Sequence, residues 1–169
     1  RQRRFGRNDY TVNYLLHLLF SDPTPDCYVG NLMGDYVKGS LDGQNQGFSP
    51  EVVRGLKQHR RIDSYAQGTA IFKQSCRRLD SNYGLYRGIM VDLFYDHFAA
   101  RHWSLFHPQA PHDFAQTIYA ILNAHPHLVA DFATIIPRMQ QHNWLVAYTR
   151  IQTIERALNF ISQRAKAHD

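Results

Sequence analysis

Apolar residues recur at intervals of three or four along most of this chain, which is the spacing of one face of an α-helix. The first such stretch, residues 13–20, is stopped by the Ser-Asp-Pro segment at 21–23. Thr24-Pro25 is typical of an N-cap followed by a first helical residue, and the helix it begins is expected to end at Gly39. Ser49-Pro50 predicts a third helix start after a glycine- and amide-rich loop. Further helices are expected over residues 71–79, 85–106 and 113–123, and in the region after Pro126.

No alternating strand pattern, internal repeat or low-complexity tract interrupts this helical pattern. The sequence therefore predicts an all-α fold, a compact single-domain helical bundle of about six to eight helices. Residues 1–12 carry little apolar periodicity and are expected to form a flexible N-terminal extension. Residues 13–169 are expected to form a single helical catalytic domain, and a hydrophobic content of 44% in 169 residues is enough for a sizeable core.

The charge balance favours an acidic partner, because the net charge is +5. The basic residues nevertheless lie in scattered clusters, without an RNA-binding aromatic signature, zinc-finger spacing or a basic zipper, so nucleic acid is not the expected partner. The two cysteines, Cys27 and Cys76, form no CxxC motif and indicate a reduced setting. The longest apolar run, at 14–20, is too short to span a bilayer. A cytoplasmic protein without stable membrane association is expected, and the oligomeric state stays open.

Four helical stretches share an unusual polar pattern within an apolar face. Each places a polar residue one helical turn before an ionisable one, so that both lie on the same side of the helix. An unpaired charge directed toward a core is costly, and a shared metal ion is an economical reason for several such groups. The pairs are Asn13/His17, Asn31/Asp35, His59/Asp63 and Asp92/Asp96, and His97 adjoins the last.

A single pair of this kind is common by chance, and a lone histidine in an apolar helix is more often a core residue than a ligand. Four pairs on four predicted helices favour a common site. His102 follows on the same predicted helix as Asp92 and is expected to lie beside that site, whereas the other histidines are assigned to the surface. No nucleophile elbow, P-loop or dinucleotide-binding glycine pattern occurs.

Segments that carry these pairs resemble one protein family, the acyl carrier protein phosphodiesterases, which are distant relatives of the HD-type metal phosphohydrolases. The resemblance covers about residues 13–150 and rests on NYLLH (13–17), GNLMGDYVKG (30–39), HRRID (59–63) and DLFYDHFAARHW (92–103). It implies an HD-like fold. It also implies hydrolysis of the phosphodiester that joins 4'-phosphopantetheine to a serine of acyl carrier protein, with a divalent cation, Mn²⁺ or alternatively Mg²⁺, as cofactor.

The same resemblance implies roles for individual residues. Asp35 matches the acidic residue that is the first candidate for an essential group in the family, and His17 matches the histidine near the start of the family's sequence pattern. On this basis we expect the metal ligands to be Asp35, His59, Asp63 and Asp96. Arg60 is expected to clamp a phosphate oxygen, and His97 or His17 to transfer a proton. Residues expected to surround and hold the ligands are Asn13, Asn31, Asp92 and His102.

A basic rim is the expected contact with the acidic carrier protein, because complementary charge speeds encounter. Ordinary solvated side chains explain the same residues equally well. Two other functions stay open at this point, a nucleotide phosphohydrolase of the HD type and a carrier-protein-binding module without catalysis. The strict HD order of ligands is not reproduced, which leaves the individual ligand assignments open. The residues of the expected rim are Lys57, Arg61, Arg77 and Arg78.

Overall fold

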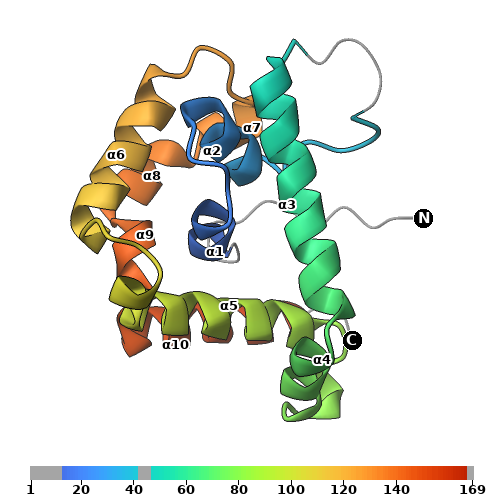
Figure 1. Cartoon of the computed structure of the whole chain (residues 1–169). Coiled ribbons are helices and arrows are strands. Elements are labelled where there is room, and N and C mark those ends of the chain that lie inside the picture. Colours follow the sequence, from blue (N-terminus) through green and yellow to red (C-terminus); the bar gives the residue numbers. More distant parts are fainter. Residues whose placement is uncertain (1–12, 42–46, 167–169) are drawn as a thin grey trace.

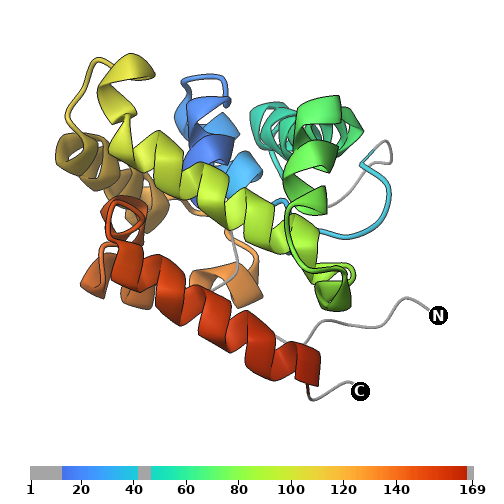
Figure 2. The same cartoon turned by 90° about the horizontal axis from the view of Figure 1, so that it is seen from below.

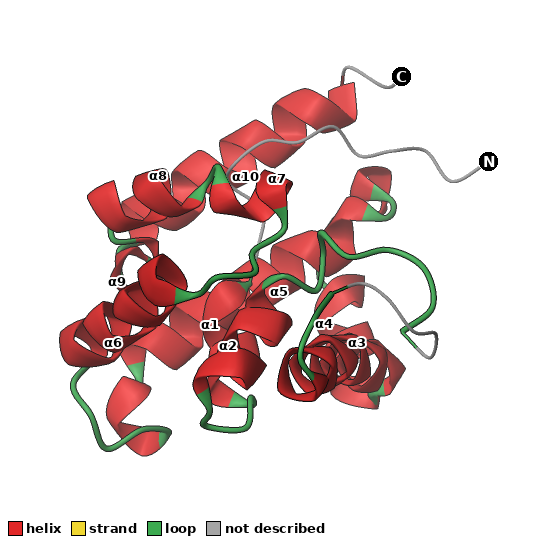
Figure 3. Ribbon diagram, turned by 90° about the horizontal axis from the view of Figure 1, so that it is seen from above, coloured by secondary structure: helices red, strands yellow, loops and turns green. Residues whose placement is uncertain are grey.

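The computed structural model describes residues 13–41 and 47–166, and the extension predicted at residues 1–12 lies outside them. Within the described ranges the regular structure consists of helices without a strand, which confirms the all-α prediction (Figures 1 and 3). None of these helices is long and apolar enough to cross a membrane. The elements are α1 (Tyr14–Leu19), α2 (Pro25–Leu32), α3 (Pro50–Gly68), α4 (Ala70–Arg77), η1 (Ser81–Tyr83), α5 (Tyr86–Arg101), η2 (Trp103–Leu105), α6 (Pro111–Ala124), α7 (Ala130–Ala133), α8 (Ile136–Gln141), α9 (Trp144–Ala147) and α10 (Ile151–Lys166).

The described helices are more numerous and shorter than expected, mainly after Pro126. Pro137 stands in the first turn of α8, where its missing N–H costs nothing but its ring prevents α7 from continuing into α8. Asn143 adopts the left-handed conformation (φ 44°) and separates α8 from α9. The region after Pro126 has a continuous apolar pattern in the sequence, but it forms the short helices α7, α8 and α9.

Side-chain caps begin α2 and α3 where the sequence predicts them. The hydroxyl of Thr24 accepts a hydrogen bond from the N–H of Cys27, and that of Ser49 accepts one from Val52. The end of α2 differs from the prediction, because the helix stops at Leu32 and a turn follows. Asp35 therefore lies on this turn and not on a helix.

Two glycines allow α2 and α3 to cross with their backbones in contact. A Cβ atom on Gly30 would stand 2.1 Å from the carbonyl oxygen of Val52, and one on Gly55 would stand 2.3 Å from that of Cys27. Any larger residue at either position would push the helices apart. The close crossing holds the turn after α2 against the middle of α3.

Helix α1 occupies the interior of the molecule, with α3 and α6 on opposite sides of it in Figure 1. Tyr14 and Leu18 of α1 are buried, and the Tyr14 ring contacts Phe132 edge-on and stacks on Trp144. Helix α10 lies along α5 in Figure 2 and packs against it. Because α1 is enclosed in this way, its polar residue His17 is also carried into the interior.

Candidate metal centre

Four polar side chains from three parts of the chain converge beside α1. Nε2 of His17 lies 3.2 Å from Oδ1 of Asp63, and Nε2 of His59 lies 3.3 Å from Oδ2 of the same carboxylate. Nε2 of His59 is also 3.5 Å from Oδ1 of Asp35. The ligand atoms offered by His17, His59 and Asp63 all lie within 4.8 Å of one another. The structure thus brings together His17 of α1, Asp35 of the turn after α2, and His59 and Asp63 of α3.

Asn31, which is fully buried, orients both imidazoles of this group. Its side-chain oxygen accepts a hydrogen bond from Nδ1 of His17 at 3.0 Å, and its main-chain oxygen accepts one from Nδ1 of His59 at 2.8 Å. Because carbonyl oxygens only accept hydrogen bonds, both histidines carry a proton on Nδ1. The two rings stack with their centroids 4.0 Å apart and their planes 14° from parallel.

The orientation of these side chains fits a cation. Nε2 of His17 is buried and forms no hydrogen bond with any residue that the structure describes, despite its short distance from Asp63. Imidazole nitrogens whose other ring nitrogen donates to a carbonyl, facing carboxylate oxygens, are a usual ligand set for a divalent metal. The His17, His59 and Asp63 group is therefore compatible with a divalent metal ion.

The charges of the group reinforce one another. Burial opposes the charge on His59, but its bonds to Asp35 and Asp63 outweigh burial and raise the pKa of His59 to about 9. Burial alone would raise the pKa of Asp63, whereas the adjacent His17 and His59 hold it well below its usual value. The pKa of Asp35 is lowered as well, because His59 outweighs the effect of burial. Without a metal, a proton on His59 thus offsets one of the two carboxylate charges at neutral pH.

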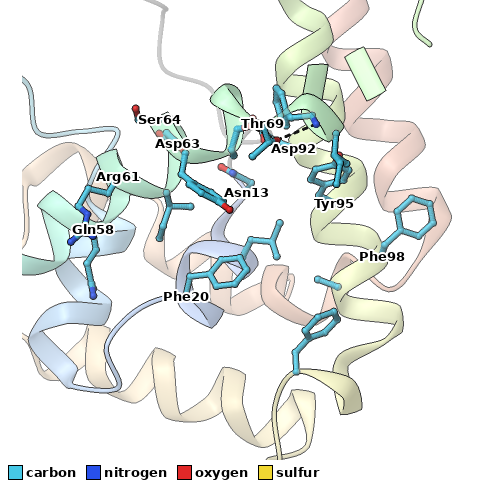
Figure 4. A pocket seen from close by; sticks show the side chains of 18 of the residues that line it. Asn13, Phe20, Gln58, Arg61, Asp63, Ser64, Thr69, Asp92, Tyr95 and Phe98 are labelled. Atoms are coloured by element: carbon cyan, nitrogen blue, oxygen red, sulfur yellow. Dashed lines mark hydrogen bonds between the residues drawn. The ribbon is translucent and has the colours of Figure 1, made fainter. Parts of the chain in front are cut away.

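A cavity of about 1240 Å³ opens beside the group, between α1, α3, α4, α5 and η2. Asp63 belongs both to the group and to the cavity wall, which is mostly apolar (Figure 4). In the same view Gln58 and Arg61 lie at one end of the cavity and Phe98 at the other. Exposed large apolar side chains surround it, which is unusual for a surface without a binding role. They are Phe20, Tyr65, Ile71, Phe98, Leu105 and Phe106.

The structure does not place Asp96 and His97 in the group. The fully buried carboxylate of Asp96 accepts hydrogen bonds from the N–H groups of Leu15 (3.1 Å) and Leu16 (3.0 Å), and so caps the N-terminus of α1. Burial raises the pKa of Asp96 to about 8. Nδ1 of His97 donates to the carbonyl of Tyr148 at 2.6 Å. Both residues hold helices together, which is a different use from the ligand and proton-transfer roles that the sequence suggests.

The other expected site residues have distinct surroundings. The guanidinium of Arg60 donates to the carbonyls of Val37 (3.1 Å) and Gly39 (2.8 Å), and so anchors the segment that follows Asp35. Half-buried Asn13, half-buried Asp92 and exposed His102 line the cavity. The four residues of the expected rim are all exposed, and Arg61 is the one among them that lines the cavity: Lys57, Arg61, Arg77 and Arg78.

Gly34 makes room for the group. A Cβ atom there would stand 2.0 Å from Cγ of His59, so a side chain at this position would displace the imidazole. The sequence suggests proton transfer for His17, whereas the structure groups it with His59 and Asp63 as residues that could hold a metal ion. The burial of α1, an apolar helix with one histidine, is the signal that could have indicated this.

Comparison with known proteins gives a consistent result over the chain. The family model described as acyl carrier protein phosphodiesterase matches residues 12–169. A protein of that name from Yersinia pestis is 29% identical over 155 residues, covering 90% of this chain and 79% of the relative. Those from Yersinia enterocolitica and Escherichia coli O45:K1 are 28% and 29% identical over 157 residues, with the same coverage of both chains. No solved structure matches the chain.

Proposed function

The chain belongs to the acyl carrier protein phosphodiesterase family, and on this premise we propose that it removes the prosthetic group of acyl carrier protein. The reaction is hydrolysis of the phosphodiester between 4'-phosphopantetheine and a serine of the carrier, which gives the apo carrier and free phosphopantetheine. The observation that carries this proposal is the group at His17, where two imidazoles and two carboxylates face one another beside a cavity.

His17, Asp35, His59 and Asp63 would hold the cofactor. A bound divalent cation would neutralise the charge of the phosphodiester and make a nearby water more acidic. Mn²⁺ suits this mixture of imidazole and carboxylate better than Mg²⁺, which prefers oxygen ligands. Asp96 leaves the proposed ligand set because backbone N–H groups occupy its oxygens.

The remaining protein groups position these ligands. Asn31 keeps the Nε2 edges of His17 and His59 directed at the carboxylates. Arg60 fixes the segment after Asp35 through its bonds to two main-chain carbonyls. The substrate then meets ligands that are already oriented, and little reorganisation is needed during the reaction.

The cavity can hold the phosphopantetheine arm of the substrate. One side of the phosphodiester is the folded carrier protein, which stays outside, and the other side is this narrow, flexible arm. Asp63 joins the ligand group to the cavity wall, so a phosphate held at the group has the cavity beside it.

The basic side chains offer the carrier a complementary surface. Lys57 and Arg61 are exposed one turn apart on α3, and Arg61 lies at the cavity. An electrostatic contribution of Lys57, Arg61, Arg77 and Arg78 predicts that KM for the carrier rises with salt, because charges farther apart than about 8 Å are screened at physiological ionic strength. A KM that does not change with salt would contradict this role.

The direct test is mass spectrometry of holo carrier protein incubated with metal-depleted protein, with and without added Mn²⁺. We expect the carrier to lose the mass of phosphopantetheine only when Mn²⁺ is present. Asp63→Asn should abolish the loss, and Glu155→Gln, an exposed change on α10, should leave it unchanged. Binding of the carrier without loss of the group would indicate a non-catalytic module, and turnover of nucleotides alone would indicate a nucleotide phosphohydrolase.

A further inference from the structure

Asp92 is a half-buried carboxyl group without a structural partner. It lies on α5 one turn before Asp96, and among the residues that the structure describes it forms no hydrogen bond or ion pair. Its neighbour Asp96 shows the contrast, since both oxygens of that residue accept backbone N–H groups. The oxygens of Asp92 are not among the buried atoms that lack a partner, so this carboxyl stays open to the cavity that it lines and can meet a molecule bound there.

The position of Asp92 relative to the ligand group suggests this reason. Asp92 and Asp63 line the same cavity, one from α5 and the other from α3 (Figure 4). Asp92 is nevertheless not one of the residues whose ligand atoms gather around His17. Asp92 lies close enough to Asp63 and Asp35 for their charges to act on it, and it lines the cavity beside them.

The surroundings of Asp92 favour its protonated form. In the metal-free protein, burial and, to a smaller extent, the charges of Asp63 and Asp35 raise the pKa of Asp92 to about 7, and a cation at the group would leave the effect of burial in place. Asp92 in turn contributes to the raised pKa of Asp96 on the same helix and to that of Cys76 on α4. A carboxyl that keeps its proton near neutral pH can donate it, as a general acid must.

The proposed reaction requires such a donor, because a serine alkoxide is a poor leaving group. Resting on the proposed function, we propose that Asp92 is the catalytic residue that protonates the leaving serine oxygen of the carrier. A water oxygen forms a bond to phosphorus while the bond from phosphorus to the serine Oγ breaks. Oγ keeps the electron pair of that bond and takes the proton of Asp92. The water loses a proton to solvent, and solvent returns one to Asp92.

A comparison of leaving groups tests this role. A phenolate with a nitro group leaves without a proton, so bis(4-nitrophenyl) phosphate needs no general acid. For Asp92→Asn we expect kcat on holo carrier protein to fall by about 10²- to 10⁴-fold, the usual contribution of a general acid. The rate on the aryl diester should fall far less, and Mn²⁺ affinity should stay unchanged. Glu155→Gln, an exposed change on α10 away from the cavity, should alter neither rate.

The outcomes separate this inference from the proposed function. A wild-type protein that does not release phosphopantetheine rejects the proposed function. If the wild-type protein does release phosphopantetheine, two results for Asp92→Asn would overturn the inference. Equal falls in rate on the carrier and on the aryl diester would show that Asp92 is not the acid. Weakened Mn²⁺ binding would show that Asp92 is a metal ligand instead. Should the variant fail to fold, a series of aryl diesters with the wild-type protein decides. Rates nearly independent of leaving-group pKa support the donor, and a steep dependence overturns it.

Discussion

The His59/Asp63 pair on α3 and the Asp96/His97 pair on α5 have the same chemical groups but opposite surroundings. Asp96 and His97 are buried, and each bonds main-chain atoms of another helix or turn. His59 and Asp63 instead direct a ring nitrogen and a carboxylate at each other and at further groups of the same kind. Burial and composition therefore do not identify a metal ligand, whereas the direction of its free lone pairs does.

The two pairs are nevertheless connected through α1. Asp96 caps the N-terminus of this six-residue helix, and His17 projects from it one turn later. So short a helix gains little stability of its own and depends on such contacts. Asp96 on α5 thus helps to position His17, one of the proposed ligands that face the His59/Asp63 pair on α3.

The largest expected difference between the pairs is in activity. Asp63→Asn removes a ligand that both imidazoles approach, and we expect the release of phosphopantetheine to fall by more than the roughly 10- to 100-fold that loss of an outer partner costs. Asp96→Asn should retain Mn²⁺ binding. Titration of both variants with Mn²⁺, followed by the carrier assay, checks this, and equal loss of Mn²⁺ affinity in both would remove the distinction.

Gly34→Ala should weaken metal binding by the His59/Asp63 pair on α3, although the substitution changes none of the proposed ligands. The added Cβ would overlap the ring of His59 and force it away from Asp35 and Asp63. We expect clearly weaker Mn²⁺ binding in calorimetric titration, in a protein that remains helical by circular dichroism. Gly88→Ala is the matched control, because a Cβ there meets nothing within 4 Å. Normal binding by the Gly34 variant would mean that the imidazole position does not matter.

Asn31→Ala removes the side-chain acceptor that orients His17 but leaves the carbonyl that orients His59. We expect a loss of about 10- to 100-fold in Mn²⁺ affinity. Asn31→Asp keeps an oxygen acceptor and should bind more tightly than the alanine variant. The reverse order of the two variants would show that the hydrogen bond to Nδ1 of His17 is not what fixes this ring.

On the α5 side the expected effect is on stability. Asp96→Ala leaves the N–H groups of Leu15 and Leu16 without their acceptor in the interior. Stranded groups of this kind cost about 1–3 kcal/mol, and each kcal/mol lowers Tm by about 2–4 °C in a chain of this size. Thermal unfolding measures the difference. An unchanged Tm would contradict the capping role.

A further expected effect is a pH dependence of the metal-free protein. The folded protein raises the pKa of His59 to about 9 from its usual 6.5. The folded state therefore binds this proton more tightly than the unfolded state, and the stabilisation is complete below pH 6.5 and lost as pH rises to 9. The free energy of unfolding of wild type minus that of His59→Gln, measured in chelator by urea denaturation, should decrease over this window. A constant difference would contradict the ion pairing of His59.

Much of this arrangement could be predicted from the sequence. The apolar spacing predicts an all-α fold, Thr24 and Ser49 mark helix starts, and the similarity of the motifs identifies the family correctly. The short helices after Pro126 could not be predicted, because their apolar pattern is continuous and the left-handed turn at Asn143 carries no local signal of comparable strength.

The ligand group was predicted less completely than the fold. The spacing of His59 and Asp63 within α3 is enough to place them on one face, but the partner of a side chain in another helix depends on how helices cross. That crossing is set by Gly30 and Gly55, which the polar pattern does not include.

The central claim is that one cation is held by His17, Asp35, His59 and Asp63. The most direct test is the anomalous difference density of a crystal of the protein grown with Mn²⁺. We predict a peak within bonding distance of Nε2 of both histidines and of the Asp63 carboxylate. A peak at Asp96 and His97 instead, or none at the His17 group, would contradict the account.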